Sequence, residues 1–265
     1  MKGILFLLLL FAWLLVPTKN IYPDLLSVVD VARQESRGRF KFYFSDLLLP
    51  SEAKQFTRDV REAQKTVEAY WGNTFDGNFW IEVSSRHRIS MALIPAWRGE
   101  RGKMLFPVHR VKERQAAIIH EMVHVYAPNQ NRFLAEGLAV YLHHRLGGNP
   151  AFPNFGKPFT QISNGLPHDV KLADLDAIVT PRRLQIAGAV DERHGYMIAA
   201  SFVGFLIEGF GLNRFAQLYA LSPLQGEQRL RVLHRDDRTG QYVSIFGKSL
   251  DALEREWVLT LQETH

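Results

Sequence analysis

The sequence contains no cysteine. Disulfide bonds and thiolate metal ligands are therefore excluded, which leaves histidine and carboxylate as the only strong metal-binding side chains. The chain also lacks a low-complexity linker and an internal repeat, so we expect a single domain over residues 21–265. Hydrophobic residues make up 46% of the chain, which is enough to build a sizeable core.

A hydrophobic run of transmembrane length is missing as well. The apolar run Ile4–Val16 follows Lys2, ends at Pro17 and falls short of the roughly 20 residues that a spanning helix needs. It is typical of a signal peptide, but no A-x-A-like cleavage site follows it and Lys19 adds a second flanking charge. The pattern leaves open a cleaved signal or a retained membrane anchor in residues 1–20. In both cases we predict an exported protein that is secreted, periplasmic or membrane-anchored.

The charge pattern does not indicate a nucleic-acid partner. The formal net charge is +5 and the isoelectric point is near 9.4, which weakly favours anionic surroundings such as a membrane face. Acidic residues separate the basic ones, and no aromatic residues recur between them, so a solvated surface is the better interpretation. These basic residues include Arg86, Arg88, Arg98, Arg101 and Arg110.

Hydrophobic periodicity predicts strands in the first half of the chain and helices in the second, which is the α+β class. Pro107 cannot donate a hydrogen bond to a neighbouring strand, so its strand is predicted at a sheet edge. Strands are predicted at Phe40–Phe44, Phe79–Val83 and Met104–Val108. Helices are predicted at 51–71 (stopped by Gly72), Lys112–Tyr126, Asn131–Leu146, Tyr196–Phe210 and Leu250–Leu261 (capped by Ser249).

The segment HEMVH, residues 120–124, combines the residue types of a metal centre. His120 and His124 are four residues apart, so on a helix both imidazoles project from one face about one turn apart. Glu121 lies one residue round the helix, where it can act as a general base on a metal-bound water. The neighbouring residues are apolar, and a metal that takes the imidazole lone pairs offsets the cost of burying polar groups among them. Without thiolates, the pattern favours zinc held by nitrogen and oxygen.

A catalytic zinc needs a third protein ligand and one position left for water. Glu136 follows His124 after a turn that would return the chain antiparallel, and Gly137 and Ala139 beside it would let the two helices approach closely. His143 lies on the same helical face as Glu136 and is an alternative ligand or a neighbour. More distant candidates are His144, Glu113, Asp191 and His194.

The segment HEMVHVYAPNQNRFLAEGLAVYL, residues 120–142, resembles the gluzincin-type peptidase MA-like metallopeptidases. In that family an H-E-x-x-H helix is followed by a helix with a W/F-L-x-E-G-x-A-x-Y motif. The segments GYMIAASFVGFLIEGFG and FGKSLDALEREW continue the likeness more weakly, while residues 1–110 carry no such motif. The resemblance implies that Glu136 is the third zinc ligand beside His120 and His124. It also implies a zincin-like fold, with a small mixed sheet whose edge strand lies over a central metal-binding helix, and a mainly helical C-terminal lobe.

The predicted function is zinc-dependent hydrolysis of a peptide or protein substrate. Glu121 would take a proton from the metal-bound water and deliver it to the departing amine. Tyr196 is the candidate donor to the developing oxyanion, with His194 second, because in similar proteins the helix that they begin faces the cleft. A peptide that adds to the predicted edge strand ending at Val108 would lie over the zinc, which favours an endopeptidase.

Two other functions stay open. A catalytically inactive, zinc-stabilised binding or scaffold domain at the cell envelope would keep the metal ligands. Such a domain has no use for Glu121, and its fourth coordination position is usually filled by protein. A basic membrane-surface protein in which HEMVH is coincidental would bind no stoichiometric metal.

Overall fold

The computed structural model describes residues 31–93, 102–149, 170–179, 182–222 and 235–263. The predicted signal or anchor, residues 1–20, lies outside them. Among the described residues, no helix has both the length and the apolar character that crossing a membrane requires.

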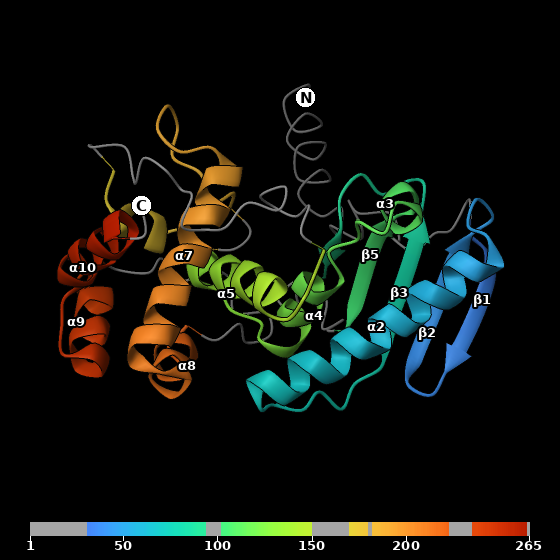
Figure 1. The fold of residues 1–265 in the computed structure, drawn as a ribbon, viewed down its shortest axis with the longest axis horizontal. Helices are drawn as coiled ribbons and strands as arrows, with labels where there is room; N and C mark the ends of the chain where they lie inside the picture. The colour runs from blue at the N-terminus through green and yellow to red at the C-terminus, as the bar shows by residue number, and fades with distance from the viewer. Residues whose placement is uncertain (1–30, 94–101, 150–169, 180–181, 223–234, 264–265) are drawn as a thin grey trace, which may run out of the picture.

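The strands that the structure describes form one mixed sheet in the order β1-β2-β3-β5-β4 (Figure 1). β1 (Val31–Arg37) is antiparallel to β2 (Phe40–Ser45), whereas β2, β3 (Phe79–Ser84) and β5 (Lys103–Pro107) run parallel. β4 (Met91–Ala92) pairs antiparallel with β5. The predicted strands of β2 and β3 are confirmed, because a buried hydrophobic residue recurs at every second position of each strand.

The prediction that the strand containing Pro107 lies at the sheet edge is wrong. β5 lies between β3 and β4, and β4 pairs with its residues Met104 and Leu105. Pro107 is tolerated because it is the last residue of β5, beyond the short β4, and serves as the N-cap of the next helix. The edge strand is therefore β4.

One helix covers a face of the sheet along most of its width. α2 (Pro50–Trp71) crosses in front of the strands (Figure 1). Its Phe56 ring meets the rings of Phe44 and Phe106 edge-on, at centroid distances of 6.4 and 5.2 Å. Gly72 ends the helix in the left-handed region at φ 77°, as predicted, which glycine adopts without a Cβ clash. The helix starts at Pro50, one residue before the predicted start, with Leu49 as its N-cap.

The continuous helix predicted over Lys112–Tyr126 is interrupted in the structure. α3 (Val108–Lys112) ends before Arg114, which has a positive φ of 58°. A residue in this left-handed conformation turns the chain out of the helix. α4 (Ile118–Tyr126) starts again after this turn, so that His120 and Glu121 lie in its first turn.

The remaining helices form the C-terminal part of the molecule (Figure 1). The predicted helices near residues 131, 196 and 250 are confirmed. Asn131 and Asp191 cap two of them through side-chain oxygens that accept backbone N–H groups, and Ser249 Oγ accepts the N–H of Ala252 in the third. Three further helices, α6, α8 and α9, were not predicted. The set is α5 (Arg132–Arg145), α6 (Leu172–Asp176), α7 (Glu192–Phe210), α8 (Leu212–Ala220), α9 (Arg235–Phe246) and α10 (Leu250–Glu263).

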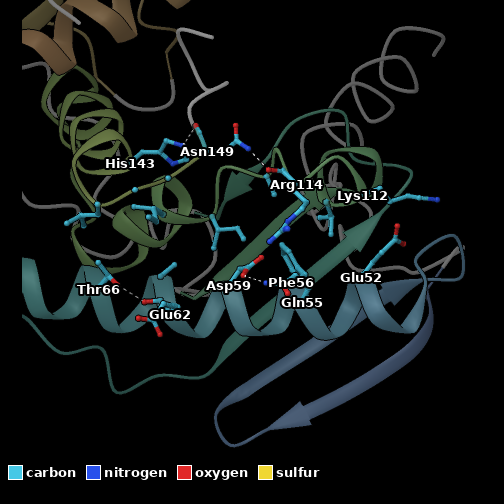
Figure 2. Close-up of a pocket in the computed structure, with 18 of the residues that line it drawn as sticks. Glu52, Gln55, Phe56, Asp59, Glu62, Thr66, Lys112, Arg114, His143 and Asn149 are labelled. Atoms are coloured by element: carbon cyan, nitrogen blue, oxygen red, sulfur yellow. Dashed lines mark hydrogen bonds between the residues drawn. The ribbon is translucent and has the colours of Figure 1, made fainter. Parts of the chain in front are cut away.

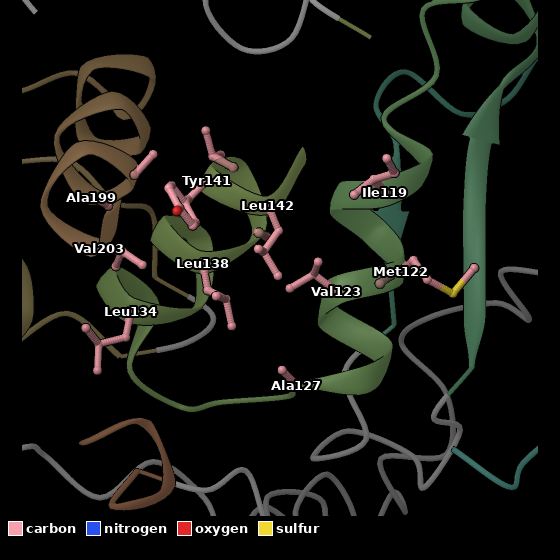
Figure 3. Packing of buried hydrophobic residues seen from close by; sticks show 14 of the residues in the cluster. Ile119, Met122, Val123, Ala127, Leu134, Leu138, Tyr141, Leu142, Ala199 and Val203 are labelled. Carbon is pink, nitrogen blue, oxygen red and sulfur yellow. The ribbon is translucent and has the colours of Figure 1, made fainter. Parts of the chain in front are cut away.

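The core continues from the sheet through α4 and α5 to α7 (Figure 3). Met122 and Val123 of α4 are buried on opposite sides, toward β5 and toward α5 respectively. Gly137 was predicted to let α4 and α5 approach, but it faces α7 instead. A Cβ on Gly137 would lie 2.7 Å from the carbonyl oxygen of Ala199, so glycine permits close contact between α5 and α7.

Candidate metal centre

α4 presents two imidazoles from one face. The Nε2 atoms of His120 and His124 lie 3.2 Å apart, and their rings are nearly perpendicular, at 86°. His120 is buried and His124 is partly buried. The four-residue spacing therefore produces the paired arrangement that it predicts.

α5 brings Glu136 to the same place. Glu136 Oε2 lies 3.1 Å from Nε2 of His120 and 3.4 Å from Nε2 of His124. These three atoms form the group of potential metal ligands found among the described residues. Glu136 is only 2% exposed, so its carboxylate is held deep between the helices.

The three atoms fit a tetrahedral ion. Ligand atoms about 2.1 Å from a tetrahedral zinc lie about 3.4 Å from one another. The three separations here, 3.1, 3.2 and 3.4 Å, match those edges. Among the described residues no donor meets Glu136 Oε2 with hydrogen-bond geometry, although this oxygen is buried. A buried acceptor without a donor is costly, and a cation at the centre of the three atoms would satisfy it.

The charges around Glu136 keep it ready to bind a cation. Burial raises its pKa, but Arg132 and then the two imidazoles oppose that effect and hold the pKa well below its usual value. Burial lowers the pKa of His120, but the neighbouring Glu136 carboxylate outweighs this effect and raises the pKa. In the metal-free protein, positive charge on the imidazoles therefore balances the negative charge of the Glu136 carboxylate. A bound divalent cation would displace the imidazole protons and take over this balance.

Glu121 lies beside this group without joining it. Its carboxylate is buried and accepts a hydrogen bond from the backbone N–H of Ala92 in the edge strand β4. Burial raises the pKa of Glu121, against the opposing charges of the two histidines. A carboxylate with a raised pKa exchanges protons more readily near neutral pH, as a general base must.

Tyr196 reaches the site indirectly. Its hydroxyl accepts a hydrogen bond from Arg132 Nη2 at 3.1 Å and donates one to Glu192 Oε1 at 3.3 Å. Arg132 Nη1 lies 2.8 Å from Glu136 Oε1. Burial, followed by the charge of Glu136, raises the pKa of Tyr196, which keeps the phenol protonated. Tyr196 is thus one residue removed from the ligand group.

The alternative ligands lie elsewhere. His143 Nε2 donates to the backbone oxygen of Asn149 at 2.9 Å, and Gly148 packs against the imidazole. Asp191 is occupied as the N-cap of α7, where it accepts the backbone N–H of His194. The side chains of Glu113, His144 and His194 are exposed. The structure therefore brings together His120, His124 and Glu136 and does not bring these five residues to them.

A cavity of about 530 Å³ lies on another side of α4, between α2 and the α3–α4 segment (Figure 2). Glu52, Asp59 and Glu62 of α2 line one wall, and Lys112 and Arg114 line part of the other. His143 lies at one end of the cavity, whereas none of the three clustered ligand atoms lines it. The cavity is therefore separate from the metal centre.

The sequence analysis missed two residues at the site. Arg132 lies four residues before Glu136 on α5, and this spacing could have predicted their ion pair. Ala92 carries no signal in the sequence, because it contributes through its backbone and its place at the sheet edge.

No family model matches the chain, and no curated protein matches its sequence. Solved structures that are similar in fold include an M1 zinc metallopeptidase from Deinococcus radiodurans, with 14% identity and a TM-score of 0.46 over 86% of this chain and 51% of that chain. A two-domain M1 zinc metallopeptidase variant bound to L-tryptophan has 13% identity and a TM-score of 0.48 over 86% of this chain and 50% of that chain. This chain spans about half the length of the structures that it matches.

Proposed function

We propose that this protein is a zinc-dependent metallopeptidase of zincin-like fold, with His120, His124 and Glu136 as the metal ligands. The observation that carries the proposal is the convergence of three buried ligand atoms at separations of 3.1, 3.2 and 3.4 Å, with Glu121 beside them. Two neutral imidazoles and one carboxylate would leave the bound ion with a net positive charge. When bound, zinc supplies Lewis acidity and lowers the pKa of a water molecule to about 7.

Glu121 moves the proton in this proposal. Its carboxylate accepts a proton from the attacking water and passes it to the nitrogen of the departing amine. The backbone N–H of Ala92 holds the carboxylate in place. Because Glu121 is buried, bulk water does not compete for the proton while the substrate covers the site.

The substrate would bind along β4. The N–H of Leu93 points toward β5, where it donates to the oxygen of Lys103 at 2.9 Å. Since these groups alternate along an antiparallel strand, the N–H and C=O of Ala92 point away from β5, and the N–H donates to Glu121. An extended peptide paired with this edge would place a backbone carbonyl near the general base. This geometry favours cleavage within a peptide chain.

Tyr196 remains the candidate for oxyanion stabilisation. Its hydroxyl hydrogen is directed at Glu192, so Tyr196 would have to exchange that acceptor for the substrate. Replacing Tyr196 by phenylalanine should then lower the rate of cleavage more than it weakens substrate binding.

The test combines zinc content with cleavage of a peptide library by the full chain. We expect one zinc per chain in the wild type and in Glu121→Gln, with cleavage only in the wild type, and neither zinc nor cleavage in Glu136→Ala. Glu113→Gln is the matched control, because Glu113 is an exposed glutamate at the end of α3. Zinc binding without cleavage of any peptide by the wild type would favour the scaffold function instead. A wild type without zinc would refute the metal centre.

Two further parts of the proposal concern the whole chain. We propose that residues 21–265 form one domain, because the core is continuous from the sheet to α10 among the described residues. We also propose that residues 1–20 direct export, on the basis of the apolar run Ile4–Val16. Fractionation of cells that express the tagged chain, together with N-terminal sequencing, tests the second point.

A further inference from the structure

We infer that Arg132 is a positioning residue that makes Glu136 a one-oxygen ligand and links this ligand to Tyr196. The inference rests on the proposed function, since the metal centre is part of it. Arg132 lies one helical turn before Glu136 on α5, and its Nη1 is 2.8 Å from Glu136 Oε1. The other oxygen, Oε2, faces the Nε2 atoms of both histidines.

The ion pair gives the two carboxylate oxygens of Glu136 different partners: Oε1 binds Arg132, and Oε2 faces the two histidines. Oε1 is engaged by a charge-assisted bond in a buried place, where such bonds are strong. Rotating the carboxylate so that both oxygens face a metal would break that bond. Arg132 therefore leaves only Oε2 for the ion, so a coordination position stays open for water or substrate.

The forked shape of the Arg132 guanidinium lets it bind Glu136 and Tyr196 at the same time. While Nη1 holds Glu136, Nη2 donates to the Tyr196 hydroxyl at 3.1 Å, and that hydroxyl reaches Glu192 on α7. A planar guanidinium presents its donors in a fixed fork, so one side chain sets the distance between α5 and α7 at this point. A lysine ammonium is a single point charge and cannot hold both partners in this geometry.

Positioning and simple charge make opposite predictions. A positive charge 2.8 Å from a ligand oxygen repels a metal cation, so at a pH at which Glu136 stays ionised, removing Arg132 would tighten zinc binding if charge were its only effect. If Arg132 instead orients the ligand, its removal loosens zinc binding although the repulsion is gone. Losing a group that orients a metal ligand typically costs about 10- to 100-fold in affinity.

The experiment compares the full-length wild type with Arg132→Met, Arg132→Lys and the control Arg145→Met. Arg145 is exposed and lies near the end of the same helix. Zinc dissociation constants come from competition with a chromophoric chelator, and the visible spectrum of the cobalt(II)-loaded proteins reports coordination number. Unfolding midpoints of the metal-free proteins show whether each variant is folded.

We expect Arg132→Met to raise the zinc dissociation constant about 10- to 100-fold. Its cobalt spectrum should lose the intense bands of four-coordination as Glu136 binds through both oxygens. Arg132→Lys should shift both readouts in the same direction by less, and Arg145→Met should match the wild type. An unchanged or tighter zinc constant with an unchanged cobalt spectrum in Arg132→Met overturns the inference. If that variant does not fold, wild-type values for Arg132→Lys overturn it.

These readouts do not depend on peptide cleavage. The inference can therefore fail while Glu121→Gln still abolishes hydrolysis, which leaves the proposed function intact. Conversely, a wild type that binds zinc and cleaves no peptide overturns the proposed function, while weaker zinc binding in Arg132→Met still supports the role of Arg132.

Discussion

Among the described residues, two arginine–carboxylate pairs with a buried carboxylate differ in how completely that carboxylate is hydrogen-bonded. In the C-terminal part, Arg238 binds Asp176 through Nε and Nη2 at 2.8 and 2.7 Å. Tyr242 and Asn131 donate to Asp176 Oδ1 at 3.1 and 2.8 Å, so both carboxylate oxygens accept hydrogen bonds. We call this cluster closed, because each oxygen of its carboxylate has a hydrogen-bond donor.

We call the pair at the candidate metal centre open, because one oxygen of its carboxylate has no hydrogen-bond donor among the described residues. Arg132 binds one oxygen of Glu136, while Oε2 and the Arg132 Nε are buried without a hydrogen-bond partner among the described residues. A buried polar group without a partner costs about 1–3 kcal/mol. The closed cluster is arranged for stability, whereas the open pair gives up stability and retains a place for a cation. The contrast distinguishes a fully hydrogen-bonded ion pair from an incompletely hydrogen-bonded one in the same chain.

The largest expected effect is the loss of the closed pair. Asp176→Ala leaves Arg238 buried without its carboxylate and should cost about 3–5 kcal/mol in the free energy of unfolding. Urea denaturation of the metal-free protein measures this. The double variant Asp176→Leu with Arg238→Met should recover part of the loss, because no charge is then left unpaired, although Tyr242 and Asn131 still lose an acceptor. If Glu136→Ala costs as much in the same assay, the distinction between the two pairs is wrong.

The next effect is a pH dependence at the end of α5. Burial lowers the pKa of His143 from 6.5 to about 4, so the folded state favours the neutral imidazole. The unfolded chain then binds more protons in acid, and stability that is complete above about pH 6.5 is lost as the pH falls through about 4. The loss amounts to about 3 kcal/mol. Urea unfolding in chelator between pH 7 and pH 4 should show a smaller decline for His143→Gln.

The charge of His120 also contributes to the lowered pKa of His143, so His143 and the candidate metal centre are electrostatically coupled. Equal pH dependence in wild type and His143→Gln would show that the decline does not come from His143.

Zinc bound to Glu136 Oε2 should stabilise the folded state. At a free concentration of 100 times the dissociation constant, a ligand that binds only the folded state stabilises it by about 2.7 kcal/mol. We expect this gain in the wild type and in the Asp176→Leu, Arg238→Met variant, and none in Glu136→Ala. Thermal unfolding with zinc, and again after chelator, measures it. A full gain in Glu136→Ala would place the zinc at another site.

Hydrophobic periodicity predicted most of the helices and strands, because these elements depend on local sequence pattern. The helices α2, α7 and α10 have apolar residues at helical spacing, and α5 is buried on all sides. Each of the four has a recognisable cap or stop, such as Asn131 or Gly72. The prediction failed where the outcome depends on the backbone of single residues or on distant partners. The positive φ of Arg114 breaks one predicted helix, and the two-residue β4 exists only through its pairing with β5.

The candidate site shows the same division. The spacing of His120 and His124 predicted their shared face, with Glu121 one residue round the helix. The likeness of the next helix to a known motif placed Glu136 beside the two histidines, as in the structure. Their roles in binding and catalysis remain predictions. Neither the fork of Arg132 nor the Ala92 N–H followed from the sequence, because both depend on how helices and strands meet in space.

The smallest expected effect concerns Asn131, the residue that joins the two regions. Its Oδ1 caps α5 by accepting the N–H of Leu134 at 2.9 Å, and its Nδ2 donates to Asp176. Asn131→Ser keeps a capping oxygen and loses the amide donor, so it should lower the free energy of unfolding by about 1 kcal/mol. Asn131→Ala should cost about 1 kcal/mol more, because the cap is also lost. Zinc affinity should stay at the wild-type value in Asn131→Ser, since Arg132 still holds Glu136. A large loss of zinc affinity there would mean that the closed cluster positions the metal ligand.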